Sequence, residues 1–156
     1  MEKYLTKIKE KRDKPQQNLI KKKNYKIEKR ILKEEVSNQI NPILRKIVST
    51  KEGTAGFANL KGYEIGGKTG TADIATAGGY SKKKINTFAS VFPTSNPKFV
   101  LVVMLDETKA NKEFVYHYRD GRNPYKGNWR NTAGWTSVEI AGKIIERIGP
   151  ILATKY

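Results

Sequence analysis

The apolar residues in the first third of the chain recur at the period of an α-helix. Six of them fall on one stripe at 3.6 residues per turn: Val36, Ile40, Ile43, Leu44, Ile47 and Val48. Pro42 interrupts the stripe, which leaves two alternatives. Either the helix kinks at Pro42, or Asn41 caps a new helix with Pro42 at its first position, where the missing N–H costs nothing.

The middle of the chain has three short runs of residues that favour β-structure, and these runs predict three strands. We expect them at residues 63–72, which are rich in glycine, at 86–92, and at the β-branched run 99–106. Residues 93–98 (PTSNPK) have the composition of a tight turn. The second and third strands are therefore expected to pair antiparallel.

A second helical stripe closes the sequence. It comprises Val138, Ala141, Ile144, Ile145 and Ile148, and we expect Gly149-Pro150 to end the helix. Trp135, at the start of this helix, is interpreted as a packing residue. The order predicts an α+β fold: an antiparallel sheet of at least three strands, with a helix on the N-terminal side and a C-terminal helix packed on it.

Charged residues are distributed unevenly along the 156-residue chain. The formal net charge is +16, and more than half of that excess falls within residues 1–33. We therefore expect residues 1–26 to form a basic, partly mobile segment, residues 27–152 to form one folded portion with a loop insertion at 107–133, and residues 153–156 to form a tail. Such charge favours anionic partners, although scattered surface lysines usually only solvate a face.

The composition also excludes several kinds of site. The chain has no cysteine, which rules out disulfides and thiolate metal sites, and it has one histidine, His117, in an aromatic loop. We expect no metal and no cofactor. The longest apolar run, residues 99–105, is too short to span a membrane, and no export signal or membrane anchor is visible.

The segment Gly66 to Ala72 (GGKTGTA) carries the clearest chemistry. A strand edge with Lys68, Thr69, Gly70 and Thr71 offers one ammonium, two hydroxyls and backbone N–H groups that no side chain at Gly70 obstructs. The ammonium and hydroxyls suit a carboxylate. The free edge suits an extended peptide, so we expect an anionic, extended ligand.

The context of this motif resembles the class B penicillin-binding proteins, especially the cell-division type. The resemblance runs through ILRKIVSTKEGTAGFANLKGYEIGGKTGTA and FASVFPTSNPKFVLVVMLDE, and resumes at TAGWTSVEIAGKIIERIGPIL. K-T-G is the third signature of serine penicillin-recognising enzymes, beside S-x-x-K and S-x-N. The resemblance covers residues 27–108 and 132–152, in the order of the family.

The resemblance implies part of a transpeptidase (β-lactamase-like) domain and a role for each motif residue. Lys68 would support the electrostatics of the cleft and a link to S-x-N. Thr69 and Thr71 would hold the carboxylate of a D-Ala-D-Ala stem peptide or a β-lactam, and the Thr71 backbone N–H would be an oxyanion-hole donor. Gly70 would keep the approach open. The family also implies the periplasmic face of the bacterial inner membrane.

The sequence departs from the family in lacking S-x-x-K and S-x-N before Lys68. Two S-x-x-K strings follow it: Ser81 to Lys84 in an expected loop, and Ser95 to Lys98 across a turn. We interpret both as coincidences of a lysine-rich sequence. The favoured hypothesis is thus a substrate-binding transpeptidase fragment that is inactive alone, whose upstream half has been lost, split off or supplied by another chain.

Two alternatives to this hypothesis remain open. One is a non-catalytic module that binds cell-wall peptide or a division protein. The other is a basic nucleic-acid binder, which only the charge and the aromatic loop suggest. Asp106-Glu107 and His117 are interpreted as solvated surface residues rather than catalytic groups.

Overall fold

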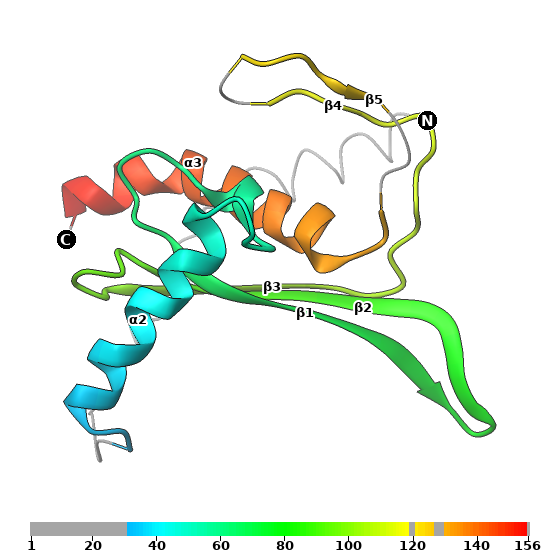
Figure 1. Cartoon of the computed structure of the whole chain (residues 1–156), viewed down its shortest axis with the longest axis horizontal. Helices are drawn as coiled ribbons and strands as arrows, with labels where there is room; N and C mark the ends of the chain where they lie inside the picture. The colour runs from blue at the N-terminus through cyan, green and yellow to red at the C-terminus, as the bar shows by residue number, and fades with distance from the viewer. Residues whose placement is uncertain (1–30, 119–120, 127–129, 156) are drawn as a thin grey trace, which may run out of the picture. The chain divides into compact units, whose positions relative to one another are not determined.

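The computed structural model describes residues 31–118, 121–126 and 130–155. The folded unit begins at Leu32, and the expectation for residues 1–26 lies outside the described residues. Its elements are α2 (Glu34–Ser49), η1 (Gly56–Ala58), β1 (Gly66–Thr76), β2 (Gly79–Phe92), β3 (Phe99–Leu105), β4 (Val115–Tyr116), β5 (Tyr125–Lys126), η2 (Ala133–Trp135) and α3 (Ser137–Lys155). The expected α+β class is confirmed (Figure 1).

The central sheet has three antiparallel strands in the order β1-β2-β3. The expected hairpin between the second and third strands is confirmed, with Phe92 opposite Phe99. β1 and β2 extend further than expected, meeting at a turn where Thr76 lies opposite Gly79. The lysine-rich residues 82–84 are strand rather than loop, because an outlying two-stranded ribbon accepts polar side chains on both faces. Lys84 pairs there with Asp73 at 2.6 Å.

The core lies between the sheet and α3, which runs along one side of it (Figure 1). Alternate residues of β2 turn toward α3, and Phe88 among them is fully buried. The helix contributes Val138, Ala141 and Ile145 to the same cluster. The end of α2 and the segment around η1 complete it, so that a short turn from residue 50 to 60 is held against both the sheet and the last helix.

Neither proline inside a helix ends it. α2 is one helix that runs through Pro42, so the alternative of a new helix beginning there is wrong. α3 runs through Pro150 to Lys155, and the expected stop at Gly149-Pro150 is wrong as well. Gly149 is buried, and an added Cβ would lie 2.1 Å from a Tyr63 ring carbon. The glycine therefore marks close packing, and the burial of the helix offsets the one hydrogen bond that Pro150 removes.

The described part of residues 107–133, for which a loop insertion is expected, contains a small two-stranded unit, β4 paired with β5. Its anchor is Tyr116, whose buried ring lies 4.4 Å from that of Phe57 in η1. The Tyr116 hydroxyl donates to the buried Glu139 carboxylate of α3 at 3.1 Å. Tyr116 thus attaches this two-stranded unit to the rest of the fold near η1. In the described part of the chain, no helix combines the length and the apolar character that crossing a membrane requires.

Candidate functional site

The Lys68–Thr71 segment lies on β1, an outer strand of the sheet. Thr69 is opposite Phe88 and Thr71 is opposite Asn86, so both threonine side chains project from the face that α3 covers. Lys68 and Gly70 belong to the other face, because side chains alternate along a strand. None of the four is packed inside: Thr69 is half-buried, and the other three residues are exposed.

The Thr69 side chain has a hydroxyl partner from another part of the chain. The Oγ1 atoms of Thr54 and Thr69 are 2.9 Å apart, and either can donate. Thr54 lies in the turn between α2 and η1, which the Ala55 N–H fixes by donating to the Ile47 carbonyl. When Thr54 is the donor, the Thr69 hydrogen remains free to bind an anion.

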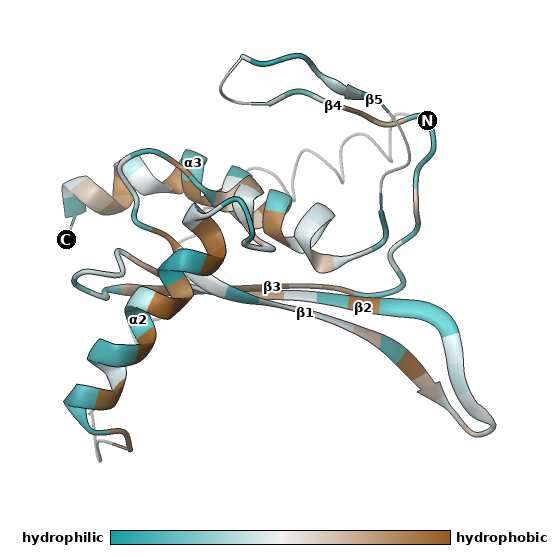
Figure 2. Cartoon of the chain, viewed as in Figure 1, coloured by the Kyte–Doolittle hydropathy of each residue, from teal (hydrophilic) through white to brown (hydrophobic). Residues whose placement is uncertain are grey.

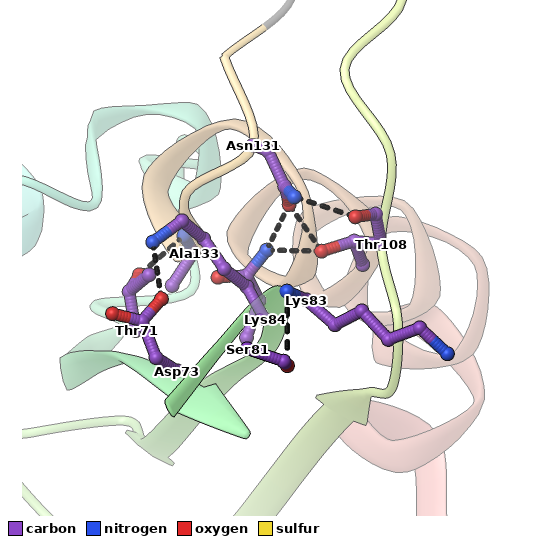
Figure 3. Close-up of polar contacts among 9 residues, drawn as sticks. Thr71, Asp73, Ser81, Lys83, Lys84, Thr108, Asn131 and Ala133 are labelled. Carbon is purple, nitrogen blue, oxygen red and sulfur yellow. Dashed lines mark hydrogen bonds and ion pairs between the residues drawn. The ribbon is translucent and has the colours of Figure 1, made fainter. Parts of the chain in front are cut away.

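The Thr71 side chain has a backbone partner. The Ala133 N–H at the start of η2 donates to Thr71 Oγ1 at 2.9 Å (Figure 3). This bond uses a lone pair of the hydroxyl and leaves its hydrogen available. Thr69 and Thr71 therefore both have hydrogen-bonded hydroxyl groups on one face of an edge strand. Thr71 has a donor hydrogen to offer, and Thr69 has one when Thr54 is the donor.

A partly buried network around the buried Asn86 amide holds η2 in this place. The Asn86 Nδ2 donates to Thr108 Oγ1 at 2.6 Å and to Asn131 Oδ1 at 2.9 Å (Figure 3). Asn131 also contacts the Thr108 hydroxyl and carbonyl. The network joins β2 to the residues that precede η2, two positions before Ala133. Asn86 thus positions the amide that orients Thr71.

Lys68 and Gly70 have different surroundings. The Lys68 ammonium donates to the Thr69 carbonyl at 2.8 Å, which holds a positive charge beside the strand. A Cβ added to Gly70 would meet only the Cβ of Thr87, at 3.9 Å. The chain's own packing therefore does not require glycine at position 70.

An open pocket of about 480 Å³ joins these parts. Its lining comes from the turn before η1, from η1 itself, from β1, and from η2 with the residue before it: Gly53, Thr54, Gly56, Phe57, Thr69, Thr71, Thr132, Gly134 and Trp135. Phe57 and Trp135 meet edge to face at 5.1 Å and form an apolar wall beside the hydroxyls. The pocket can therefore hold a ligand with a carboxylate at one end and an apolar part beside it.

Sequence reasoning identified only Thr69 and Thr71 of the lining as site residues and missed the other seven, among them Thr54, Phe57, Thr132 and Trp135. The available signals were weak, namely the E-G-T and T-A-G-W strings within the family resemblance. Gly134 shows how closely their segments pack, because an added Cβ would lie 2.6 Å from the Thr54 carbonyl oxygen. Trp135 packs against Phe57 and Tyr125, as expected, but it lies in η2 before α3 begins.

The two serines of the S-x-x-K strings lie outside the pocket lining. Ser81 is in β2, which corrects its expected loop position, and its Oγ accepts from the Lys83 N–H at 3.2 Å (Figure 3). Ser95 follows β2, and its hydroxyl and N–H donate to Glu64. These bonds hold the pKa of the Glu64 carboxyl below its ordinary value. Neither serine is therefore among the residues that line the pocket with Thr69 and Thr71.

The other candidates are surface residues. Glu107 pairs with Lys83 at 2.7 Å, and both side chains are more than half exposed. His117 is exposed after β4. Within residues 31–118, 121–126 and 130–155, no three His, Asp or Glu side chains gather where they could share a metal ion.

Comparisons with known proteins agree on one family. A family model described as penicillin binding protein transpeptidase domain matches residues 1–122. The probable peptidoglycan D,D-transpeptidase FtsI of Caulobacter vibrioides is 32% identical over 136 residues, which are 81% of this chain and 21% of that protein. Stage V sporulation protein D of Bacillus subtilis is 35% identical over 96 residues, 61% of this chain and 15% of that protein.

Solved structures share the fold. The transpeptidase domain of Burkholderia pseudomallei penicillin-binding protein 3 aligns with a TM-score of 0.52 at 24% identity, over 73% of this chain and 29% of that one. Penicillin-binding protein 3 of Mycobacterium tuberculosis complexed with aztreonam aligns with a TM-score of 0.51 at 26% identity, over 74% and 25%. The chain thus spans less than a third of each of these four proteins.

Proposed function

This chain belongs to the penicillin-binding-protein transpeptidase domain family, and we propose that it holds the D-Ala-D-Ala end of a peptidoglycan stem peptide, or a β-lactam, along the open edge of β1. One observation carries the proposal: the Thr69 and Thr71 hydroxyls line the same pocket, each with its oxygen oriented by a partner from outside the strand.

Each residue of the motif has a distinct part in this function. Thr69 and Thr71 donate to the terminal carboxylate, and the Lys68 ammonium adds positive charge beside it. The Thr71 backbone N–H serves as an oxyanion-hole donor, a kind of group whose loss costs about 2.7–4 kcal/mol of transition-state stabilisation. Gly70 leaves room for the peptide backbone of the ligand to pair with the strand edge.

The acyl-transfer step itself needs a nucleophile from elsewhere in the domain. Neither S-x-x-K nor S-x-N occurs before Lys68 in this sequence, and Ser81 and Ser95 lie outside the pocket lining. The chain by itself is therefore a binding unit, and as part of a complete domain it contributes the substrate-binding strand. The site of action would be the periplasmic face of the inner membrane.

Reversible binding tests the site. Isothermal titration with a stem peptide ending in D-Ala-D-Ala is expected to show weaker affinity for Lys68→Ala than for the wild type. Lys82→Ala, which removes an exposed lysine from β2, is the matched control and should bind like the wild type. Equal affinities for Lys68→Ala and Lys82→Ala would remove the motif from the proposal.

Covalent labelling tests the inactivity of the isolated chain. Fluorescent penicillin forms a stable acyl-enzyme only with an activated serine. We expect no labelled band after denaturing electrophoresis. A label located by mass spectrometry at Ser81 or Ser95 would show that the chain carries its own nucleophile.

The two alternative functions differ in what they share with this site. A non-catalytic module for cell-wall peptide would use the same pocket. It would differ only in that no other segment brings a nucleophilic serine to the bound peptide. A nucleic-acid binder would instead rest on charge alone, and its affinity would fall steeply with salt concentration. No contact in the described residues favours it over the pocket.

A further inference from the structure

Asn86 is a polar residue at a core position of the sheet. Like Phe88, it projects from the face of β2 that α3 covers, and its side chain is fully buried. Its Oδ1 atom is buried and accepts no hydrogen bond from the described residues. An unpaired buried acceptor destabilises a fold, and an apolar side chain of similar size would avoid that cost. Natural proteins accept such exceptions chiefly at functional sites.

The amide group of Asn86 joins the two ends of the 107–133 segment (Figures 1 and 2 show its course). Both Nδ2 hydrogens are used, one toward Thr108 Oγ1 at 2.6 Å and one toward Asn131 Oδ1 at 2.9 Å. Thr108 and Asn131 also bond to each other, hydroxyl to amide oxygen and amide to carbonyl, across 23 residues of sequence (Figure 3). We call the side chains of Asn86, Thr108 and Asn131 the clasp. The clasp closes the segment at its base and ties that base to β2.

The clasp leads directly into the support of Thr71. Only Thr132, in an extended conformation, separates Asn131 from Ala133, whose N–H donates to Thr71 Oγ1 at 2.9 Å (Figure 3). Ala133 is buried, whereas the Thr71 residue is exposed. Among the described residues, the Thr71 hydroxyl makes no other hydrogen bond. The orientation of this hydroxyl therefore depends on where the clasp places η2.

We propose that Asn86, Thr108 and Asn131 are positioning residues for carboxylate recognition, which hold the Ala133 N–H against Thr71 and so leave the Thr71 hydroxyl hydrogen for the ligand. The inference rests on the proposed function for the identity of that ligand. None of the three clasp residues lines the pocket, so each acts through η2. Such preorganisation raises affinity, because the hydroxyl does not have to be ordered when the ligand binds.

Asn86→Val releases the base of the segment from β2, while Thr108 and Asn131 still bond to each other. We expect the unfolding midpoint in urea to change little, since the unpaired acceptor is removed as well. The affinity of the whole chain for a synthetic stem peptide ending in D-Ala-D-Ala should fall about threefold to tenfold, the cost of ordering one side chain on binding. Isothermal titration measures the affinity.

The Ala133 amide gives a second readout, which needs no ligand. In the nitrogen–proton correlation spectrum of Asn86→Val, the Ala133 signal should shift. Its hydrogen exchange should accelerate about fivefold relative to the amides of α3, because the bond to Thr71 opens more often. An Ala133 amide that exchanges at the wild-type rate would overturn the inference.

Thr108→Val and Thr108→Ser are a matched pair, and they replace Asn86→Val in every comparison if that variant does not fold. Thr108→Val removes the hydroxyl, and Thr108→Ser retains it. The valine variant should behave like Asn86→Val, and the serine variant should restore both the affinity and the exchange of Ala133. Val103→Ala, in the core on β3 and outside the clasp, should lower the unfolding midpoint without changing the affinity.

A double-mutant cycle with Thr71 separates positioning from a general loosening of the fold. Once Thr71→Val has removed the hydroxyl, Asn86 has nothing left to position. Adding Asn86→Val should then cause no further loss of affinity. Losses that add in the double variant would contradict the inference.

The outcomes separate this inference from the proposed function. If the wild-type chain does not bind stem peptide, or if Lys68→Ala binds like Lys82→Ala, the proposed function fails. The Ala133 amide then still decides whether the clasp positions Thr71. If binding depends on Lys68 but Asn86→Val binds like the wild type, the clasp inference alone is overturned.

Discussion

The backbone N–H of Ala133 donates to the hydroxyl of Thr71 at 2.9 Å, across 62 residues of sequence. This bond links η2 to the edge strand β1 and fixes the orientation of the Thr71 hydroxyl group. The Thr54 and Thr69 hydroxyls are hydrogen-bonded to each other at 2.9 Å, and either can be the donor. The candidate site is therefore a motif on one strand together with two supports from distant turns.

Thr71→Val tests the double role of this hydroxyl. The variant leaves the Ala133 N–H without its acceptor, so we expect the free energy of unfolding to fall by about 1 kcal/mol. It also removes a donor to the ligand carboxylate, which should weaken stem-peptide affinity about tenfold or more, because hydrogen bonds to charged groups contribute about 1.5–3 kcal/mol. Urea denaturation and calorimetry measure the two effects. Thr71→Ser should retain both interactions, and an equal loss in Thr71→Ser would contradict this role.

Gly70→Ala separates ligand approach from folding. The added Cβ has room within the chain, its nearest contact being 3.9 Å away. We expect the unfolding midpoint in urea to remain close to that of the wild type and the affinity for stem peptide to fall. Gly56→Ala, where an added Cβ meets nothing within 4 Å, is a control in the pocket lining. A destabilised Gly70→Ala with unchanged affinity would show that glycine serves the fold instead.

Gly149→Ala should destabilise the fold, because its Cβ would lie 2.1 Å from the ring of Tyr63. Overpacking of this kind costs about 1–3 kcal/mol. Gly78→Ala is the control, since an added Cβ there has open space. Thermal denaturation measured by circular dichroism compares the two. Equal melting temperatures would mean that the close approach of α3 to Tyr63 contributes nothing to stability.

Tyr116→Phe removes the hydroxyl that donates to the buried carboxylate of Glu139 at 3.1 Å. The carboxylate loses a partner in a buried place, so we expect a loss of about 1–3 kcal/mol in the free energy of unfolding. Tyr80→Phe, at an 81% exposed position, should have no measurable effect. Should Tyr116→Phe be as stable as Tyr80→Phe, the insertion would not be anchored to α3 by this bond.

Much of the fold could be predicted from periodicity. The stripe from Val36 to Val48 gave a helix, and the β-branched run at 99–105 gave a strand that pairs back on its neighbour. These patterns are local, because a helix or a half-buried strand repeats its burial every few residues. The misjudged positions were residues where local chemistry and packing disagree. Gly149-Pro150 has the composition of a helix stop, yet Gly149 is the place where α3 passes closest to Tyr63.

The long β1–β2 ribbon shows the same limit. Lys82, Lys83 and Lys84 have the composition of a loop, but in the structure they continue β2. Ion pairs support two of them: Lys84 pairs with Asp73 on the neighbouring strand β1, and Lys83 pairs with Glu107, which follows β3. Pairing partners of this kind cannot be identified from one strand alone, because the register of the sheet decides which charges meet.

By itself, the sequence determined the α+β class and the strand that carries Lys68, Thr69, Gly70 and Thr71, because side-chain alternation and motif chemistry are properties of neighbouring residues. Only the tertiary structure decided that Thr54 and Ala133 support the two threonines, and that Phe57 and Trp135 wall the pocket. Those relationships depend on how α3 and the turn before η1 pack against the sheet. The periodicity of apolar residues along the sequence carries no information about that packing.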